Sequence, residues 1–301
     1  MKSWHKYLVY ASLAFLAVSL YKANFLKVPQ IFSVSSLIAS FIFLFAGFIT
    51  NAISWKQILK GSNCHVGIGT CIAGFGLSIF TKYIPGKFWM IMGRAVYITQ
   101  KNPYSLRTLS AISLNAQFIA LWLGLIFGMI GLFLLDGLHQ WGWFILSLWT
   151  CFTVVIFSKL AHAKTERVIG LVLRKDITLP RLTIKSTFSV MPWFSLYWIL
   201  WSIGFYMLVV SLTKMNVQWG VGFGFPLAGV LGIMTFISPG GLGTREGVIV
   251  AYLTLASIPV VEATTIAVAS RLWFLTGEVF IFIVGWVAHK RSNKTPFKTG
   301  S

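Results

Sequence analysis

Nine apolar segments follow one another along the chain, and they decide what it can fold into. They lie near residues 7–26, 30–55, 64–81, 113–135, 141–158, 187–213, 219–237, 246–258 and 264–288. A run of about 20 apolar residues is long enough to cross a bilayer as a helix. Only 10% of the 301 residues are charged, whereas a soluble domain has about 25%. The sequence therefore predicts an all-α integral membrane protein, with residues 1–301 in a single membrane domain.

The basic residues predict which loops face the cytoplasm. The chain has 25 Lys and Arg against six Asp and Glu, a net charge of +19. Many of the basic residues gather in 82–107, 159–185 and the tail 289–301, and loops rich in Lys and Arg stay on the cytoplasmic side. We therefore expect both chain termini in the cytoplasm. This topology and anionic lipid headgroups explain the charge, so no nucleic-acid partner is expected.

Two apolar segments cannot cross the membrane fully without exporting a basic loop. If 64–81 crossed, the basic stretch 82–107 would face the opposite side from the basic end of the preceding span. The conflict disappears if 64–100 enters and leaves on the cytoplasmic side, and if 219–258 enters and leaves on the outer side. With these two re-entrant hairpins, about six full transmembrane helices account for the rest of the chain.

Each predicted hairpin turns at a Pro-Gly pair. The pairs are Pro85-Gly86 and Pro239-Gly240. Proline cannot continue the hydrogen-bond ladder of a helix, and glycine permits a positive φ, so both pairs should break the helix. Similar breaks in two halves, approached from opposite faces, are typical of an inverted repeat with a central site. The expected parts are a first repeat at about 1–112, a second at about 113–288, and the tail 289–301.

The second break carries the strongest candidate site. It reads SPGGLGTREG over residues 238–247, ahead of a helix expected to begin near Thr244. A helix N-terminus attracts anions, and the guanidinium of Arg245 suits phosphate. Glu246 is expected to tune that charge; a structural hinge with a neutralised Arg-Glu pair is the alternative. The glycines that would expose backbone N–H groups to a ligand are Gly240, Gly241 and Gly243.

The first break offers a second anion-binding patch. Lys87 and Arg94 are seven residues apart, so they share one face of a helix. We expect this patch to be reached from the cytoplasm. The alternative is that both side chains snorkel to the membrane interface.

The last apolar segment contains two charges at the same spacing, Arg271 and Glu278. Ionisable residues inside a membrane are costly, so they are expected to find partners. Pairing with Glu246 and Arg245 would give a four-residue ionic cluster. A purely structural ion-pair network is the alternative.

The motifs of familiar enzymes are absent from the sequence. It contains no HExxH, CxxC, GxSxG or P-loop pattern, so we expect no metal, no cofactor and no catalytic residue. The 13 Trp and 26 Phe are expected to face lipid and the membrane interface.

At these residues the chain resembles the lysylphosphatidylglycerol synthase transmembrane-region family. Residues 239–247 are similar to its hallmark PGG-x-G-x-RE-G, and Pro85-Gly86-Lys87 with Arg94 is similar to a second, PGK hallmark. Trp55-Lys56 resembles an aromatic-basic pair that closes the second span. The three elements occur in order, so the resemblance covers nearly the whole chain.

Two places depart from that family pattern. Many members follow PGK with a Gly-Glu pair where this chain has Trp89-Met90, and often have a Glu-Arg pair where this chain has Asn115-Ala116-Gln117. An acidic role therefore cannot be transferred to Trp89-Met90, and the second departure indicates a divergent branch of the family, for which a different substrate is an alternative.

The resemblance implies a stand-alone membrane module that moves lipid. We expect a flippase- or scramblase-type translocase of the cell envelope, in a prokaryotic cytoplasmic (inner) membrane, for a phospholipid or a polyprenyl-phosphate-linked carrier. The headgroup would bind Lys87, Arg94, Arg245 and Arg271. The alternatives are a lipid-linked glycosyl or acyl transferase, and a non-catalytic partner of glycosyltransferase or polysaccharide-assembly proteins. Membrane lipids, mainly anionic ones, are the expected partners, and a homo-oligomer is an open alternative.

Overall fold

The computed structural model describes residues 30–83, 88–136, 140–158, 184–235, 241 and 243–294, and every regular element in them is a helix. Within these residues, five helices are long and apolar enough to cross a membrane. They are α2 (Val34–Gly61), α5 (Leu106–Asp136), α6 (Gln140–Phe157), α8 (Ile184–Leu212) and α11 (Val260–Lys294). This confirms the predicted all-α membrane fold. The further span predicted near 7–26 lies outside the described residues.

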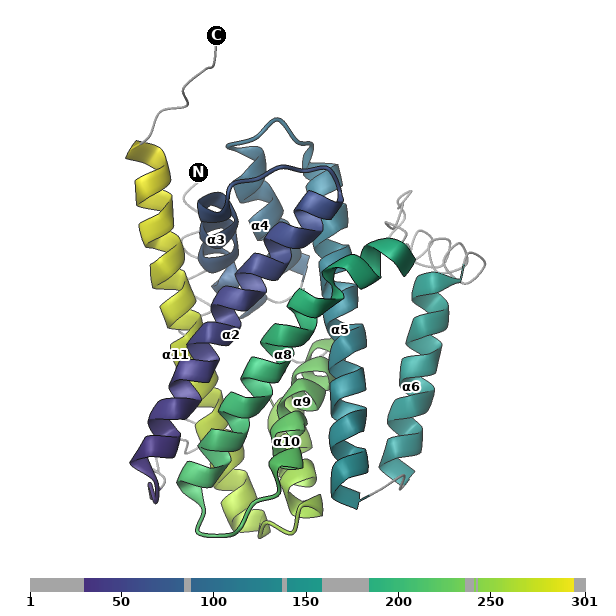
Figure 1. Ribbon diagram of the computed structural model, residues 1–301, viewed down its shortest axis with the longest axis vertical. Helices are drawn as coiled ribbons and strands as arrows, with labels where there is room; N and C mark the ends of the chain where they lie inside the picture. Colours follow the sequence, from purple (N-terminus) through teal and green to yellow (C-terminus); the bar gives the residue numbers. More distant parts are fainter. Residues whose placement is uncertain are drawn as a thin grey trace.

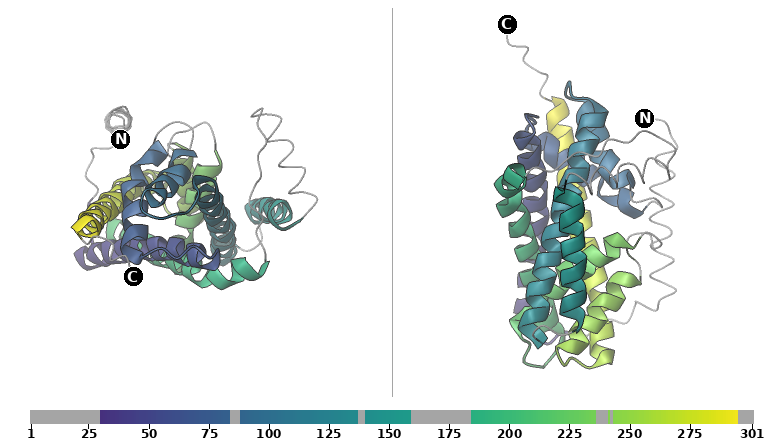
Figure 2. Two further views of the ribbon diagram at one scale, coloured as in Figure 1. Left: turned by 90° about the horizontal axis from the view of Figure 1, so that it is seen from above. Right: turned by 90° about the vertical axis from the view of Figure 1, so that its right-hand side faces the viewer.

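The long helices stand side by side (Figure 1). α2 begins where Ser33 Oγ accepts the backbone N–H of Ser36 at 3.3 Å, an N-cap that the serine supplies. From there α2 packs along α8 more extensively than any other pair of helices. α6 packs on α5 at one edge of the molecule (Figure 2).

Shorter helices form two further units, here called the first and second hairpins. The first consists of α3 (Ile68–Leu77), η1 (Ile79–Tyr83) and α4 (Phe88–Thr99), and the second of η2 (Trp219–Phe223), α9 (Gly224–Met234) and α10 (Thr244–Leu255). Figure 1 shows α3 and α4 in the upper half of the molecule and α9 and α10 in the lower half. The predicted breaks at Pro85-Gly86 and Pro239-Gly240 lie outside the described residues, and the re-entrant path through a bilayer stays a prediction.

The packing partners of the two hairpins correspond. α3 packs against α2 and α11, whereas α9 packs against α8 and α5. α4 packs against α5, whereas α10 packs against α11. Exchanging α2 with α8 and α5 with α11 therefore converts one set of contacts into the other. The predicted inverted repeat requires this correspondence; the repeat stays a prediction, and its expected boundary near residue 112 falls inside α5.

Glycines allow each hairpin to lie close to a long helix. A Cβ added at Gly285 of α11 would lie 3.0 Å from the Cα of Gly76 in α3. A Cβ added at Gly128 of α5 would lie 2.8 Å from the Cβ of Leu227 in α9. Small residues let helix backbones approach in this way inside membranes, where packing replaces the hydrophobic effect as the source of association.

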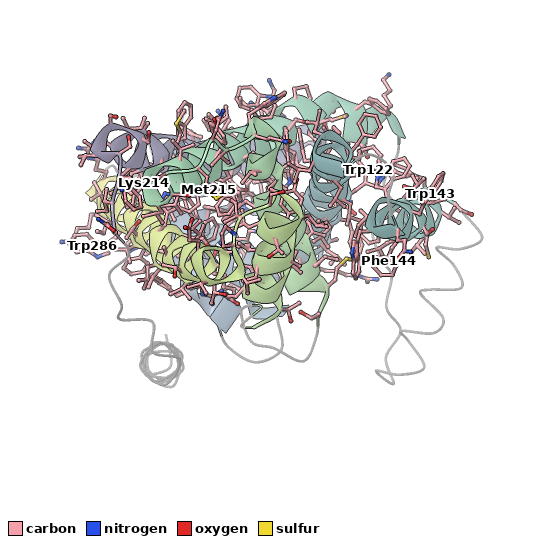
Figure 3. The ribbon with its side chains drawn as sticks, turned by 90° about the horizontal axis from the view of Figure 1, so that it is seen from below. Trp122, Trp143, Phe144, Lys214, Met215 and Trp286 are labelled. Carbon is pink, nitrogen blue, oxygen red and sulfur yellow. The ribbon has the colours of Figure 1, made fainter. Side chains whose placement is uncertain are left out.

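Some aromatic residues are exposed as expected, and others are not. Trp143 and Trp286 are exposed and project at opposite edges of the molecule (Figure 3). In contrast, Trp55 is 1% exposed, and Trp201 is buried with its ring centroid 5.1 Å from that of Phe48. The prediction that the aromatics face lipid is wrong for these three residues, because they pack in the interior between the hairpins.

Candidate functional site

A cavity of about 500 Å³ lies between the two hairpins. Its walls come from both hairpins together with residues of α2, α5, α6, α8 and α11, and most lining side chains are apolar or aromatic. Three lining side chains are cations: Lys82 of η1, Arg94 of α4 and Arg245 of α10. No Asp or Glu is found among the described residues that line it. The cavity is therefore a positively charged chamber with an aromatic wall.

Arg94 lies on the wall that the first hairpin shares with α2 and α5. Its guanidinium carbon is 4.4 Å from the ring centroid of Trp55, and its Nη2 donates a 2.7 Å hydrogen bond to the backbone carbonyl of Ser113. The side chain is 6% exposed. Arg94 therefore does not snorkel to an interface as the alternative proposed. The residues predicted to join it, Pro85, Gly86 and Lys87, lie outside the described residues.

The helix predicted after the second break, α10, begins at the expected residue. α10 starts at Thr244, and Gly241 and Gly243 have φ angles of +72° and +83°, a region that glycine tolerates best. A Cβ at Gly241 would also lie 3.1 Å from the Cα of Gly232. The N–H of Gly243 donates to Glu246 Oε2 at 2.8 Å, so this carboxylate helps to cap the helix. Pro239 and Gly240 lie outside the described residues.

Arg245 projects from the first turn of α10 between two aromatic rings. Its guanidinium carbon is 4.6 Å from the ring centroids of both Phe225 and Phe274. The Nζ of Lys82 lies 5.0 Å from the centroid of Phe274. Cations from the two hairpins therefore meet on one ring, and cation–π attraction offsets part of the cost of holding them away from water.

Two ion pairs connect the hairpins to the last helix. Arg271 Nη1 lies 3.6 Å from Glu246 Oε1, which confirms one of the pairs in the predicted four-residue cluster. Lys82 Nζ donates a hydrogen bond to Glu278 Oε1 and forms an ion pair with it. Arg271, Glu246 and Glu278 are not among the residues that line the cavity. Of the two ion pairs, the one between Glu278 and Lys82 therefore positions and balances a lining cation, whereas Glu246 balances Arg271.

Lys82 is the member of this group that the sequence analysis missed as a site residue. It was counted only among the basic residues of 82–107, which were assigned to the cytoplasmic surface. One signal was present: Lys82 ends an apolar run just before Pro85-Gly86, which places it at the tip of the predicted hairpin.

Comparison with known proteins identifies the family. The family model described as "Lysylphosphatidylglycerol synthase TM region" matches residues 4–285. No curated protein matches the chain. Together with the five candidate spans in the described residues, the match gives a multi-pass membrane protein with a lipid-related function. The chain belongs to the lysylphosphatidylglycerol synthase TM region family.

Proposed function

We propose that this protein is a membrane lipid translocase, of the flippase or scramblase type, for a phosphate-bearing lipid such as a phospholipid or a polyprenyl-phosphate-linked carrier. One observation carries the proposal: a single cavity is lined by a cation from α4, a cation from η1 and a cation from α10, with no carboxylate among its described lining residues. Charge-assisted hydrogen bonds from guanidinium and ammonium groups are the usual way in which proteins hold phosphate.

The arrangement suggests how a headgroup would move. Arg94 would hold the phosphate on the side of the first hairpin, and Lys82 and Arg245, which share the ring of Phe274, would hold it next. The lipid tails would stay in the bilayer throughout. Only the headgroup then needs a polar path, because transfer of the polar headgroup is the costly part of moving a lipid across hydrocarbon.

The charge balance favours an anionic cargo. Among the described residues, four cations (Lys82, Arg94, Arg245 and Arg271) and two carboxylates (Glu246 and Glu278) leave two positive charges in excess. Inside a low-dielectric interior an uncompensated charge is costly, and a phosphate that enters supplies the missing negative charge.

The same contacts favour transport over a membrane-embedded glycosyl or acyl transferase. A transferase needs a general base, and the groups that the sequence offers for this role are Glu246, Glu278, Asp136 or a histidine. Glu246 and Glu278 are each held in an ion pair, and no Asp, Glu or His is found among the described residues that line the cavity. As part of the same proposal, both termini face the cytoplasm of a prokaryotic inner membrane, and the partners are membrane lipids together with glycosyltransferase or polysaccharide-assembly proteins.

Vesicles that contain the purified protein and fluorescent phosphatidylglycerol test this function. Wild-type protein should let dithionite quench the lipid of the inner leaflet, and Arg245→Gln should lower the rate to that of protein-free vesicles. Arg107→Gln is the matched control, because Arg107 is an exposed arginine outside the cavity. A wild-type rate for folded Arg245→Gln would contradict the proposal.

A further inference from the structure

We infer that the headgroup accepted by this cavity is a net-anionic phosphate that carries no amino group. The inference rests on the proposed function and names the substrate class of the same site. Three features carry it: the placement of the acidic residues, the unsatisfied donors on the wall, and the cations around them.

The first feature is that the chain has few carboxylates, and those in the described residues do not line the cavity. There are six in the whole sequence. Glu246 and Glu278 are in ion pairs, and Glu262 accepts a 2.9 Å hydrogen bond from Thr213 near the start of α11. The remaining acidic residues are Asp136, where α5 ends, and Glu166 and Asp176, in the segment 159–183 outside the described residues.

The two breaks themselves add no carboxylate. Residues 84–87 read IPGK and residues 236–240 read FISPG, so neither contains Asp or Glu. Among the described lining residues, the uncharged polar side chains are those of Asn51, Ser54, Ser78, Gln117 and Tyr197, together with the indole N–H groups of three tryptophans. An ammonium group in the cavity would therefore meet no opposite charge on these walls.

The second feature is a pair of donors that lack an acceptor. Arg94 Nε is buried without a hydrogen-bond partner in the described structure, and so is Nε1 of Trp55, the ring on which Arg94 lies. Both residues line the cavity. Arg94 also forms no ion pair with any described carboxylate. A buried donor left unsatisfied is costly, and a phosphate oxygen is an acceptor that suits both groups.

The third feature is repulsion. An amino group brought to the phosphate position would lie among Lys82, Arg94 and Arg245, which all line the same cavity. Like charges inside a low-dielectric interior disfavour each other strongly, and specificity against a wrong ligand often comes from such a repulsive contact. The cavity therefore selects acidic lipids and rejects zwitterionic or aminoacylated ones.

Binding to the purified protein in detergent tests this directly. The probes are dihexanoyl phosphatidic acid, farnesyl phosphate, dihexanoyl phosphatidylethanolamine and dihexanoyl lysylphosphatidylglycerol, measured by calorimetric titration. We expect the two acidic probes to bind at least about tenfold more tightly than the two that carry an amine. The tighter of the acidic pair shows whether a glycerophospholipid or an isoprenoid phosphate is the source of the headgroup.

Two variants sharpen the result. Arg94→Gln should weaken both acidic probes by about tenfold or more, whereas Arg107→Gln should leave them unchanged. Gln117→Glu is nearly isosteric and places a carboxylate on the cavity wall, so it should tighten binding of the lysyl probe.

Either of two results would overturn the inference: binding of the lysyl probe as tight as that of the acidic probes, or no saturable binding of an acidic probe. The titration measures binding and not transport, so the proposed headgroup selectivity and the proposed translocase function can be refuted independently. Acidic probes that bind selectively but do not move in vesicles would refute only the translocase.

Discussion

Lys82 in the first hairpin and Glu278 in α11 form a partly buried ion pair in which only the lysine lines the cavity. The Glu278 side chain is 1% exposed, and the Lys82 side chain is 22% exposed. The pair therefore has two separable consequences. It fixes η1 to the last long helix, and it presents an ammonium group to the cavity beside Phe274.

Exchanging the two charges separates these roles. Lys82→Glu alone should destabilise the protein, because it places a second carboxylate beside buried Glu278. Lys82→Glu combined with Glu278→Lys should recover most of the thermal stability in detergent, since the pair is rebuilt. Lipid movement in vesicles should stay impaired, because the cation no longer lines the cavity. A stable double variant that moves lipid at the wild-type rate would show that Lys82 acts only as a structural residue.

The ion pair between Arg271 and Glu246 should behave as a coupled unit. Glu246→Gln leaves the guanidinium of Arg271, which is 3% exposed, without this carboxylate, and breaking such a buried pair costs about 3–5 kcal/mol. Adding Arg271→Gln should cost less than the sum of the two single changes. Thermal unfolding of wild type, the two single variants and the double variant, monitored by intrinsic fluorescence, gives the coupling free energy between the two residues. Strictly additive shifts in melting temperature would mean that the pair contributes nothing.

The crossing of α3 and α11 should tolerate no side chain at Gly76. A Cβ there would collide with the backbone carbonyl of Ile281 and lie 3.0 Å from the Cα of Gly285. Gly76→Ala should therefore destabilise by about 1–3 kcal/mol. Gly69→Ala on the same helix is the matched control, since nothing lies within 4 Å of its Cβ and alanine favours a helix by about 0.5–1 kcal/mol. Equal melting temperatures for the two variants would contradict the close packing.

Cys64 should react slowly with maleimide. Cys64 and Cys71 are buried, whereas Cys151 is exposed on α6, a helix long and apolar enough to cross a membrane, where it would face lipid. Burial raises the pKa of the Cys64 thiol above its usual value, so less of the reactive thiolate is present at neutral pH. In detergent at pH 7, maleimide should modify Cys64 more slowly in the folded protein than in protein unfolded by denaturant, and modification of the folded protein should increase as the pH rises. Mass spectrometry of tryptic peptides gives both rates, and equal rates would contradict the burial of Cys64.

The same chemistry tests the topology. In a variant with Cys151→Ser, Lys214→Cys should react with a membrane-impermeant maleimide in intact cells. Gly170→Cys in the same background should react only after permeabilisation, because the basic loop 159–185 is expected in the cytoplasm. The reverse pattern would overturn the proposed orientation.

Charge patterns in the sequence predicted much of the site. Arg271 and Glu246 lie in or beside apolar segments, where a charge needs a partner, so the sequence offered their pairing as one way to meet that cost. The start of α10 at Thr244 followed from the glycines before it. These inferences needed only local sequence and the properties of a bilayer.

The positions of the Lys82 and Trp55 side chains depend on tertiary packing and could not be predicted from the local sequence. Lys82 carries the same signal as a basic residue at a cytoplasmic interface, and only the turn of η1 against α11 directs it to Glu278. Trp55 is similar, since an aromatic residue near the end of a helix suits either the interface or an interior wall. Its burial under Arg94 depends on α4, which is distant in the sequence.

The rate of phospholipid movement in vesicles that contain Arg94→Gln or Arg94→Lys tests the central claim most directly. Both proteins should first be shown to elute as the same monodisperse peak as wild type. We expect vesicles with Arg94→Gln to move fluorescent phosphatidylglycerol no faster than protein-free vesicles, while Arg94→Lys retains part of the wild-type rate because the charge remains. A wild-type rate for Arg94→Gln would contradict a path built on buried cations.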